Sequence, residues 1–168
     1  MGIRAIEYVL KPVFHKEIIN RYAGEYKEDP LFVTSLIKVE SNFLRRAKSR
    51  KGALGLMQIM PKTAQETAKE LQVKSYDLKD PETNIRFGIH HLSKLKREFG
   101  NDPVTILGAY NAGSKNVREW LKEKNKRNLE IQDIEFLETR NFVENVLSTY
   151  EWLKRIQKWR NRIIRLKT

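Results

Sequence analysis

The amino-acid sequence predicts an all-α fold. Three Asp-Pro pairs punctuate the chain, at positions 29–30, 80–81 and 102–103. Aspartate is favoured at the helix N-cap and proline at the first helical position, so each pair indicates a helix start. Apolar residues then recur at three- and four-residue intervals, as they do on one face of a helix. No segment of strand length alternates between polar and apolar residues, and a short hairpin within residues 47–59 is the most β-structure that we expect.

Glycines and prolines limit the predicted helices. The helix that begins at Pro81 should end at Gly100, and the one that begins at Pro103 should end at Gly113, because glycine is the commonest helix stop. Ser114 can then cap the next helix. Further helices are expected over residues 16–26, 30–40, 61–71, 114–121 and 138–160.

The C-terminal part of the chain is the most basic. Residues 122–132 are polar and rich in charge, and we expect a surface loop there. The last helix should bury one apolar face, formed by Phe142, Val143, Val146, Leu147, Tyr150 and Leu153. Residues 152–168 hold seven Lys or Arg, no acidic residue and two tryptophans. We expect this tail to pack on the domain as far as about Trp159, although such a segment could also bind an anionic polymer or a membrane surface.

Length and composition predict one domain. The 168 residues show no linker and no repeat, so we expect a single unit over residues 1–168, with a core over about 22–152 and a basic C-terminal helix over 153–168. The absence of cysteine excludes disulfides and thiolate metal sites. No apolar run is long enough to span a membrane.

Glu40 is the first candidate for chemistry. It continues the apolar stripe of Val33, Leu36 and Ile37 and so should point toward packed interior. Burial disfavours a charged carboxylate and raises its pKa, as does the carbonyl end of a helix. A carboxyl group that stays protonated near neutral pH can act as a general acid. The alternative is a glutamate at a frayed helix end, exposed or paired with an arginine at position 45 or 46.

The segment after Glu40 lacks the second acid of a two-carboxylate glycosidase, because residues 41–65 contain no Asp or Glu. Gly55 permits close approach of a ligand, and Gln58 can hydrogen-bond to an amide or a sugar hydroxyl. Met57 and Met60 would form adaptable apolar walls beside it. The same strip also fits a buried turn of the core.

Four short segments together resemble the soluble lytic transglycosylases. They are Glu-Ser at 40–41, GLMQIMP at 55–61, AYNAG at 109–113 and ETR at 138–140. Their order and spacing match as well, and the resemblance covers about residues 22–152. It implies a lysozyme-like fold with a groove beside the catalytic glutamate, and it implies that the substrate is the glycan strand of peptidoglycan.

The resemblance implies cleavage of the β-1,4 bond between N-acetylmuramic acid and N-acetylglucosamine without water. Glu40 would act first as general acid. The substrate's own N-acetyl oxygen would stabilise the positive sugar, because no second carboxylate is present. Glu40 would then act as base toward the muramic C6 hydroxyl, which closes a 1,6-anhydro ring. No cofactor and no metal are required.

Six further residues are candidates for substrate binding: Ser49, Gln58, Met60, Tyr110, Asn111 and Glu138. Tyr110 could hydrogen-bond to Glu40 or to a sugar, or be a core aromatic. Asn111 could bind substrate or simply fix the helix stop. Glu138 could contact the peptide stem or cap the last helix. The family usually has tyrosine where this chain has Phe142, which removes one hydroxyl.

Neither adjacent histidine is assigned to a metal. His90 and His91 face different directions on a helix and lack the i, i+4 spacing of a chelating pair. Ser41 should be a hydrogen-bonding residue at the helix end. Ser49 has no histidine near it in sequence and is not read as a nucleophile.

The net charge of +12 implies an anionic partner. Peptidoglycan strands and anionic wall polymers fit this charge, and so does nucleic acid, which the four segments make the weaker choice. Two other functions stay open, a hydrolytic lysozyme on the same fold and a basic wall-binding module.

The family acts outside the cytoplasm, in the periplasm or the cell wall. Residues 1–14 have no clear signal-peptide core, because Arg4, Glu7 and Lys11 interrupt it. We therefore expect that a leader or anchor has been removed and that Met1-Gly2 is a cloned start. Export by another route, or a phage or mobile-element origin, is the alternative.

Overall fold

A computed structural model describes residues 15–165 and confirms the all-α class. Residues 1–14, on which the expectations about a leader and Met1-Gly2 fall, lie outside the described residues. The described elements are α2 Lys16–Tyr26, α3 Pro30–Ser41, α4 Pro61–Glu70, α5 Pro81–Phe99, α6 Pro103–Ala112, α7 Ser114–Glu123, the 3-10 turn η1 Ile131–Asp133, and α8 Leu137–Arg165.

The three Asp-Pro pairs begin helices as predicted. The carboxylate of Asp29 accepts a hydrogen bond from the backbone N–H of Leu31 at 2.7 Å and caps α3. Asp80 caps α5 and Asp102 caps α6 in the same way, through the N–H groups three residues on, at 2.9 and 2.8 Å. Each cap satisfies a backbone donor that the helix itself leaves unpaired.

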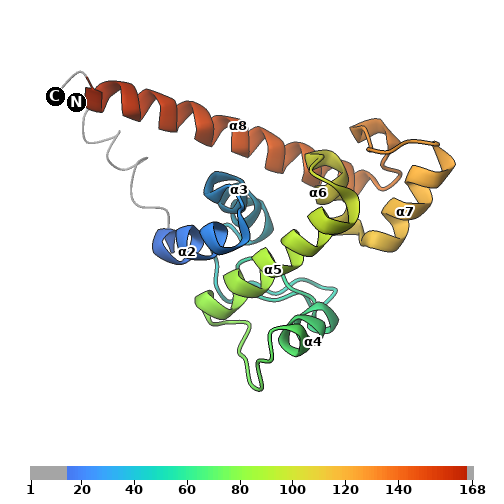
Figure 1. The fold of residues 1–168 in the computed structure, drawn as a ribbon, viewed down its shortest axis with the longest axis horizontal. Coiled ribbons are helices and arrows are strands. Elements are labelled where there is room, and N and C mark those ends of the chain that lie inside the picture. The colour runs from blue at the N-terminus through green and yellow to red at the C-terminus, as the bar shows by residue number, and fades with distance from the viewer. Residues whose placement is uncertain (1–14, 166–168) are drawn as a thin grey trace.

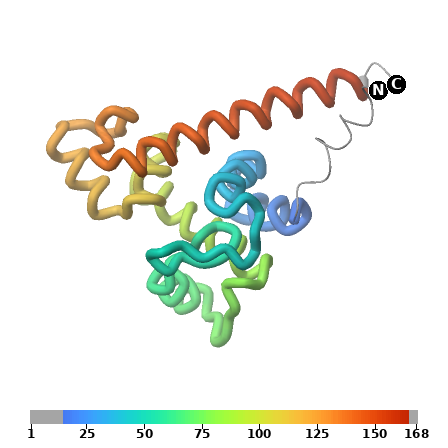
Figure 2. The backbone as a smooth tube through the Cα atoms, turned by 180° about the vertical axis from the view of Figure 1, so that it is seen from behind, coloured from blue at the N-terminus to red at the C-terminus, as the bar shows by residue number. Residues whose placement is uncertain are grey.

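The long helix α5 lies at the centre of the body. The helices α2, α4 and α6 pack against it, and α8 crosses over α3 and α6 (Figure 1). The segment between α3 and α4 runs across the face that is seen from behind (Figure 2). It contains two isolated antiparallel bridges, which join Leu54 to Lys48 and to Ile59, so the expected hairpin is reduced to single pairings.

Two predictions about the α6–α8 region are wrong in part. Gly113 is the N-cap of α7, and the hydroxyl of Ser114 donates instead to the carboxylate of Glu98 at 3.3 Å. Residues 122–132 are not wholly a surface loop, because Leu129 is buried in the core. Its backbone N–H donates to the hydroxyl of Thr105 at 2.8 Å, which ties the segment to α6.

The helix α8 begins as predicted and continues further. Phe142, Val143 and Val146 are buried, and the remaining members of the predicted face are partly buried. The expected packing through Trp159 is wrong, because Trp152 and Trp159 are 53% and 46% exposed. Tyr150 contacts Asp29 and Phe32 at the N-terminal end of α3, and α8 continues beyond this point (Figure 1).

Substitution of Gly88 tests how closely α5 packs against Met57. A Cβ atom at this position of α5 would lie 2.3 Å from Met57 Sδ and 2.8 Å from Met57 Cβ, both buried. We predict that Gly88→Ala lowers the free energy of unfolding by about 1–3 kcal/mol, although alanine normally favours a helix.

Gly24→Ala in α2 is the matched control, since nothing lies within 4 Å of the position that its methyl group would take. It should raise the free energy of unfolding by up to about 1 kcal/mol. Urea denaturation of both variants measures the difference, and equal effects at the two positions would contradict the proposed close packing.

Candidate active site

Glu40 lies in the last turn of α3, one residue before the helix ends at Ser41. Its helix is anchored by fully buried neighbours, Leu36 and Ile37, and Glu40 itself is only partly exposed. Burial raises the pKa of this carboxyl group to about 8. Among the ion pairs between residues 15 and 165 none includes Glu40, so the alternative of a salt bridge to Arg45 or Arg46 is wrong.

The chain turns sharply after Glu40. Asn42 and Phe43 both have left-handed backbone angles, with φ of 50° and 62°. The Ser41 hydroxyl oxygen lies 2.8 Å from the carbonyl oxygen of Leu56 and 3.1 Å from that of Ile37, and it can donate its proton to either. Ser41 is thus a hydrogen-bonding residue at the helix end, as expected, and it ties the segment 40–41 to the segment 55–61.

Gln58 holds its own loop together. Its side-chain nitrogen donates to the carbonyl of Gly55 at 2.8 Å and to that of Ala47 at 3.2 Å, and its backbone is left-handed with φ 46°. Both hydrogens of the amide are used in this way. The amide oxygen Oε1 is therefore the atom of Gln58 that remains for a ligand.

The two methionines of this strip differ. Met57 is fully buried in the core and cannot form a wall of a binding site, so that expectation is wrong. Met60, the N-cap residue of α4, has 41% of its surface exposed and is available to a ligand.

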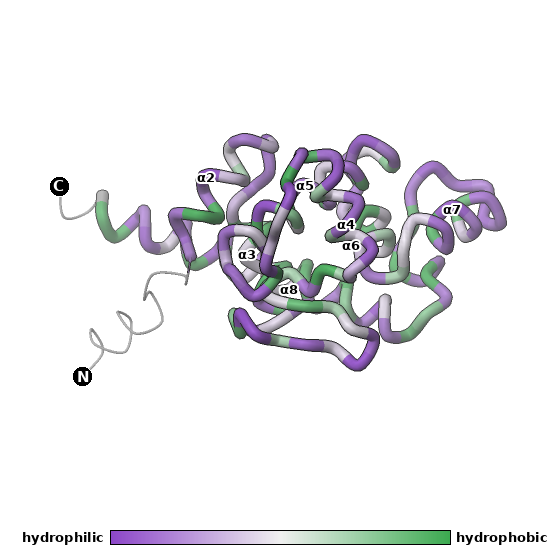
Figure 3. The backbone as a smooth tube through the Cα atoms, turned by 90° about the horizontal axis from the view of Figure 1, so that it is seen from below, coloured by the Kyte–Doolittle hydropathy of each residue, from purple (hydrophilic) through white to green (hydrophobic). Residues whose placement is uncertain are grey.

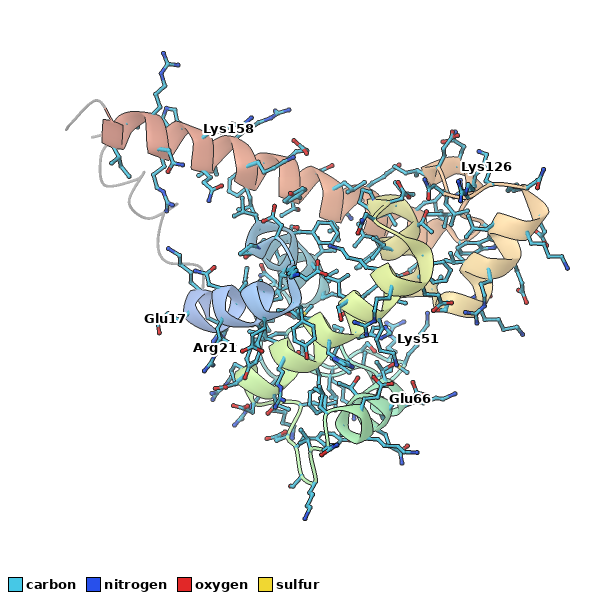
Figure 4. The ribbon with its side chains drawn as sticks, viewed as in Figure 1. Glu17, Arg21, Lys51, Glu66, Lys126 and Lys158 are labelled. Atoms are coloured by element: carbon cyan, nitrogen blue, oxygen red, sulfur yellow. The ribbon has the colours of Figure 1, made fainter. Side chains whose placement is uncertain are left out.

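Ser49 and Glu138 lie on the loop and on the first turn of α8. The hydroxyl oxygen of Ser49 accepts a hydrogen bond from the backbone N–H of Ala53 at 3.0 Å, which closes the basic loop. The hydroxyl hydrogen can still be donated to a ligand. Glu138 is exposed and forms an ion pair with Lys51 of the loop at 3.3 Å (Figure 4 labels Lys51).

Tyr110 does not donate to Glu40. Its hydroxyl group donates instead to the backbone carbonyl of Met57 at 2.8 Å. Burial raises the pKa of Tyr110 well above its usual range, and the neighbouring Glu40 adds to the shift. Tyr110 therefore joins the segment 109–113 to the segment 55–61. It also lies close enough to Glu40 for the two groups to interact electrostatically.

His91 is a neighbour of this site that the sequence did not identify. Its ring lies against Tyr110, with 5.4 Å between ring centroids. Burial lowers the pKa of His91 to about 4, so the ring is neutral near pH 7. His90 points elsewhere and lies 2.7 Å from the carboxylate of Glu70, as different directions for adjacent helical residues require.

Asn84 is the second residue that the sequence did not identify. This buried side chain of α5 accepts from the N–H of Met57 at 2.7 Å and donates to the carbonyls of Leu54 and Leu78, each at 2.9 Å. A Cβ atom on Gly55 would lie 2.1 Å from the Asn84 amide nitrogen, so glycine is required there. No signal in the sequence distinguishes Asn84 from Glu82 and Thr83, the polar residues directly before it.

The segments 109–113 and 138–140 also meet. The hydroxyl group of Thr139 donates to the side-chain oxygen of Asn111 at 2.7 Å. Asn111 is exposed, and its amide nitrogen donates no hydrogen bond to another described residue. All four segments singled out in the sequence are therefore linked to one another. Within residues 15–165 no group of three or more His, Asp or Glu side chains is placed to hold a metal ion.

Residues 17–132 match the family model described as the transglycosylase SLT domain. The chain belongs to this family. The soluble lytic murein transglycosylase of Escherichia coli K12 is 36% identical over 144 residues, and the alignment covers 82% of this chain and 22% of that protein. A putative soluble lytic murein transglycosylase of Haemophilus influenzae is 34% identical, with 82% and 24% covered.

Solved structures agree with this assignment and with the lysozyme-like fold. The 70-kDa soluble lytic transglycosylase in complex with bulgecin A is 34% identical with a TM-score of 0.80, over 87% of this chain and 25% of that chain. An inactive glutamate-to-glutamine mutant of the lytic transglycosylase Slt from Pseudomonas aeruginosa is 34% identical with a TM-score of 0.74, over 83% and 24%. The SLT-domain chain thus spans about a quarter of each relative.

Asn84 supports the loop of the SLT domain, and its removal should be costly. We predict that Asn84→Ala lowers the free energy of unfolding by about 2–5 kcal/mol, because it removes the side-chain partner of the Met57 N–H and of the Leu54 and Leu78 carbonyls, of which the Leu54 carbonyl keeps a second hydrogen bond from the N–H of Ile59. Asn145→Ala, at an exposed position of α8, is the matched control and should change stability by less than about 0.5 kcal/mol. Thermal and urea unfolding measure the stability of both variants. An Asn84→Ala variant as stable as the parent would exclude this supporting role.

The pKa of Glu40 predicts a pH dependence of stability. The folded protein binds the Glu40 proton more tightly than the unfolded chain does, so burial of this group costs nothing below about pH 4.5. As pH rises from about 4.5 to 8 the unfolded chain ionises first, and the folded state loses stability. Glu40→Gln removes this loss, on the order of a few kcal/mol at pH 8.

Melting temperatures of the two proteins should therefore agree near pH 4 and diverge as pH rises, with Glu40→Gln the more stable. Glu66→Gln, at an exposed site on α4, is the control and should show no such divergence (Figure 4 labels Glu66). The decisive quantity is the difference in melting temperature between Glu40→Gln and the parent. If this difference is the same at pH 8 as at pH 4, Glu40 is not a buried protonated carboxyl group.

Proposed function

We propose that this chain is a lytic transglycosylase domain that cleaves the glycan strands of peptidoglycan without hydrolysis. Membership of the SLT family supports the reaction class, and the names of the relatives, soluble lytic murein transglycosylases, support the substrate. The catalytic unit is proposed to be a single domain with its core over residues 22–152, while α8 continues beyond it.

The observation that carries the proposal is the burial of Glu40 without an ionic partner. A carboxyl group with a pKa of about 8 keeps its proton at neutral pH and can protonate the oxygen of the leaving sugar. The inactive glutamate-to-glutamine mutant of the Pseudomonas aeruginosa relative is consistent with one essential glutamate in that protein.

The second step is proposed to need no other protein carboxylate. Residues 41–65, which follow Glu40, contain no acid, and burial is the cause of the pKa shift of Glu40. The N-acetyl oxygen of the substrate can therefore stabilise the developing positive charge on the muramic sugar. The ionised Glu40 then accepts the proton of the C6 hydroxyl group, whose oxygen bonds to the anomeric carbon. The product ends in 1,6-anhydromuramic acid, and the proton balance is restored on Glu40.

Gln58, Ser49 and Met60 are proposed to hold the sugars. The free oxygen of Gln58 and the hydroxyl group of Ser49 can accept from and donate to N-acetyl or hydroxyl groups. Met60 offers an apolar surface to a sugar ring. Tyr110 is proposed to border the site beside Glu40, and Asn111 and Glu138 to contact the substrate at the end of the site nearest α8.

We propose that the protein acts outside the cytoplasm, where its substrate lies. One relative, 38% identical over 88 residues, is named a membrane-bound lytic murein transglycosylase. Anionic wall polymers remain a proposed additional partner, on the basis of the net charge of +12.

Glu40→Gln tests the proposed mechanism. The variant keeps the shape of the side chain but has no proton to donate, so release of muropeptides from purified sacculi should fall at least about a thousandfold. Mass spectrometry of the products of the parent protein should show anhydro ends and no reducing muramic ends.

Glu123→Gln, at an exposed position at the end of α7, is the control and should retain full activity. Reducing ends as the main product would replace the ring-closing reaction by hydrolysis. Unchanged activity of a folded Glu40→Gln variant would remove Glu40 from the catalytic role.

A further inference from the structure

The part of α8 beyond the body forms a separate feature, which we call the α8 arm, residues 152–165. The earlier turns of α8 pack on α3 and α6, whereas the arm continues past the N-terminal end of α3 in both views of the chain (Figures 1 and 2). The proposed reaction at Glu40 assigns no task to this arm. Hydrophobic and hydrophilic residues are interspersed along it (Figure 3).

The arm carries an apolar stripe. Trp152, Ile156, Trp159 and Ile163 follow one another at intervals of four, three and four residues, so they share one face of the helix. The two tryptophans are about half exposed. At about 100° per residue, this face lies more than a third of a turn away from the one that Val146 and Tyr150 turn toward the body. The stripe is therefore not an extension of the packed face.

Basic residues flank this stripe. Residues 152–168 contain seven Lys or Arg and no Asp or Glu. Lys154 is engaged by Glu151 at 2.5 Å and by the ring of Tyr150. Arg155, Lys158 and Arg162 are exposed and form no ion pair with another described residue (Figure 4 labels Lys158 on the arm). These three share a second face of the helix, next to the tryptophan stripe.

We propose that the α8 arm is a docking surface for an anionic lipid bilayer. A helix with an aromatic stripe and a basic flank lies in the plane of the interface, where its rings reach the headgroup level and its cations reach the lipid phosphates. No described helix is both long and apolar enough to cross a membrane, so the contact is with the surface of the bilayer.

A bilayer fits the arm better than the other anionic partners do. A phosphate-rich wall polymer or a double-stranded nucleic acid would neutralise the cations but would bury little of an apolar stripe that also includes Ile156 and Ile163, whereas a bilayer can bury the whole stripe. A second copy of the chain could cover the stripe, but it would bring two arms of the same charge together, with no acidic residue after Glu151 to offset them.

The three tryptophans of the chain provide the test. Trp120 is 3% exposed in the core and acts as an internal reference, whereas Trp152 and Trp159 report on the arm. The full chain is mixed with one of two kinds of vesicle. The first is phosphatidylcholine alone, and the second also contains phosphatidylglycerol at about 30 mol percent, on the order of a physiological anionic fraction. We expect co-sedimentation and a blue shift of tryptophan emission with the anionic vesicles only, and quenching by brominated acyl chains.

Two pairs of variants separate the parts of the arm. Trp152→Ser with Trp159→Ser removes both reporters, so this variant is measured by co-sedimentation, in which partitioning should weaken at least about tenfold. Arg155→Glu with Lys158→Glu should weaken partitioning to the same extent and should also lose the blue shift. The matched controls lie elsewhere on the surface: Leu44→Ser with Tyr76→Ser for lost apolar area, and Arg127→Glu with Lys122→Glu for the same change of charge. Both controls should partition like the parent.

Three results would overturn the proposal. The first is absence of binding to anionic vesicles, or binding that both arm variants retain. The second is binding to a purified anionic wall polymer through the cations, with tryptophan emission unchanged and no vesicle binding. The third is an arm-dependent dimer in sedimentation velocity that does not partition to vesicles. Cleavage of soluble peptidoglycan fragments by the arm variants should equal that of the parent, which keeps this test independent of the proposed function.

Discussion

The structure depends on one constraint, a carboxyl group held at the end of a buried helix without a charged partner. A partly buried acid would normally be neutralised by a cation, yet Arg45 and Arg46 are exposed and form no ion pair with Glu40. Burial instead raises its pKa to about 8 and keeps the proton in place. The apolar helix α3 sets the direction of Glu40, and Ser41 beside it ties the helix end to the loop through the carbonyl of Leu56.

That loop is held by polar groups from the helix beneath it. Asn84 forms hydrogen bonds to three backbone groups around Gly55, and the side chain of Gln58 adds hydrogen bonds to two backbone carbonyls. The backbone is left-handed at Gln58 and Gly55, which an unsupported loop would not favour. The hydrogen bonds offset this cost, and they explain why one small asparagine on α5 controls a segment some thirty residues earlier in the chain.

Much of this arrangement could be predicted from local chemistry, and the rest required long-range contacts. Asp80 and Asp102 begin helices because an N-cap acts within three residues, and the spacing of Leu36 and Ile37 is enough to bury Glu40. The partner of Tyr110 could not be predicted, because Met57 is brought to it only by the fold. Periodicity also identified an apolar face near Trp159 but could not say that the body ends before reaching it.

The hydrogen bond of Tyr110 bears on how one glutamate could serve both of the proposed steps. If the tyrosine hydroxyl donated to Glu40, it would stabilise the ionised carboxylate and lower the pKa, and the acid would lose its proton before a substrate arrived. The hydroxyl group donates to the carbonyl of Met57 instead, and burial raises the pKa of Glu40 to about 8. A group with such a pKa gives up a proton to a leaving oxygen and takes one from a sugar hydroxyl with comparable ease. The neutral ring of His91 against Tyr110 adds no positive charge that would disturb this balance.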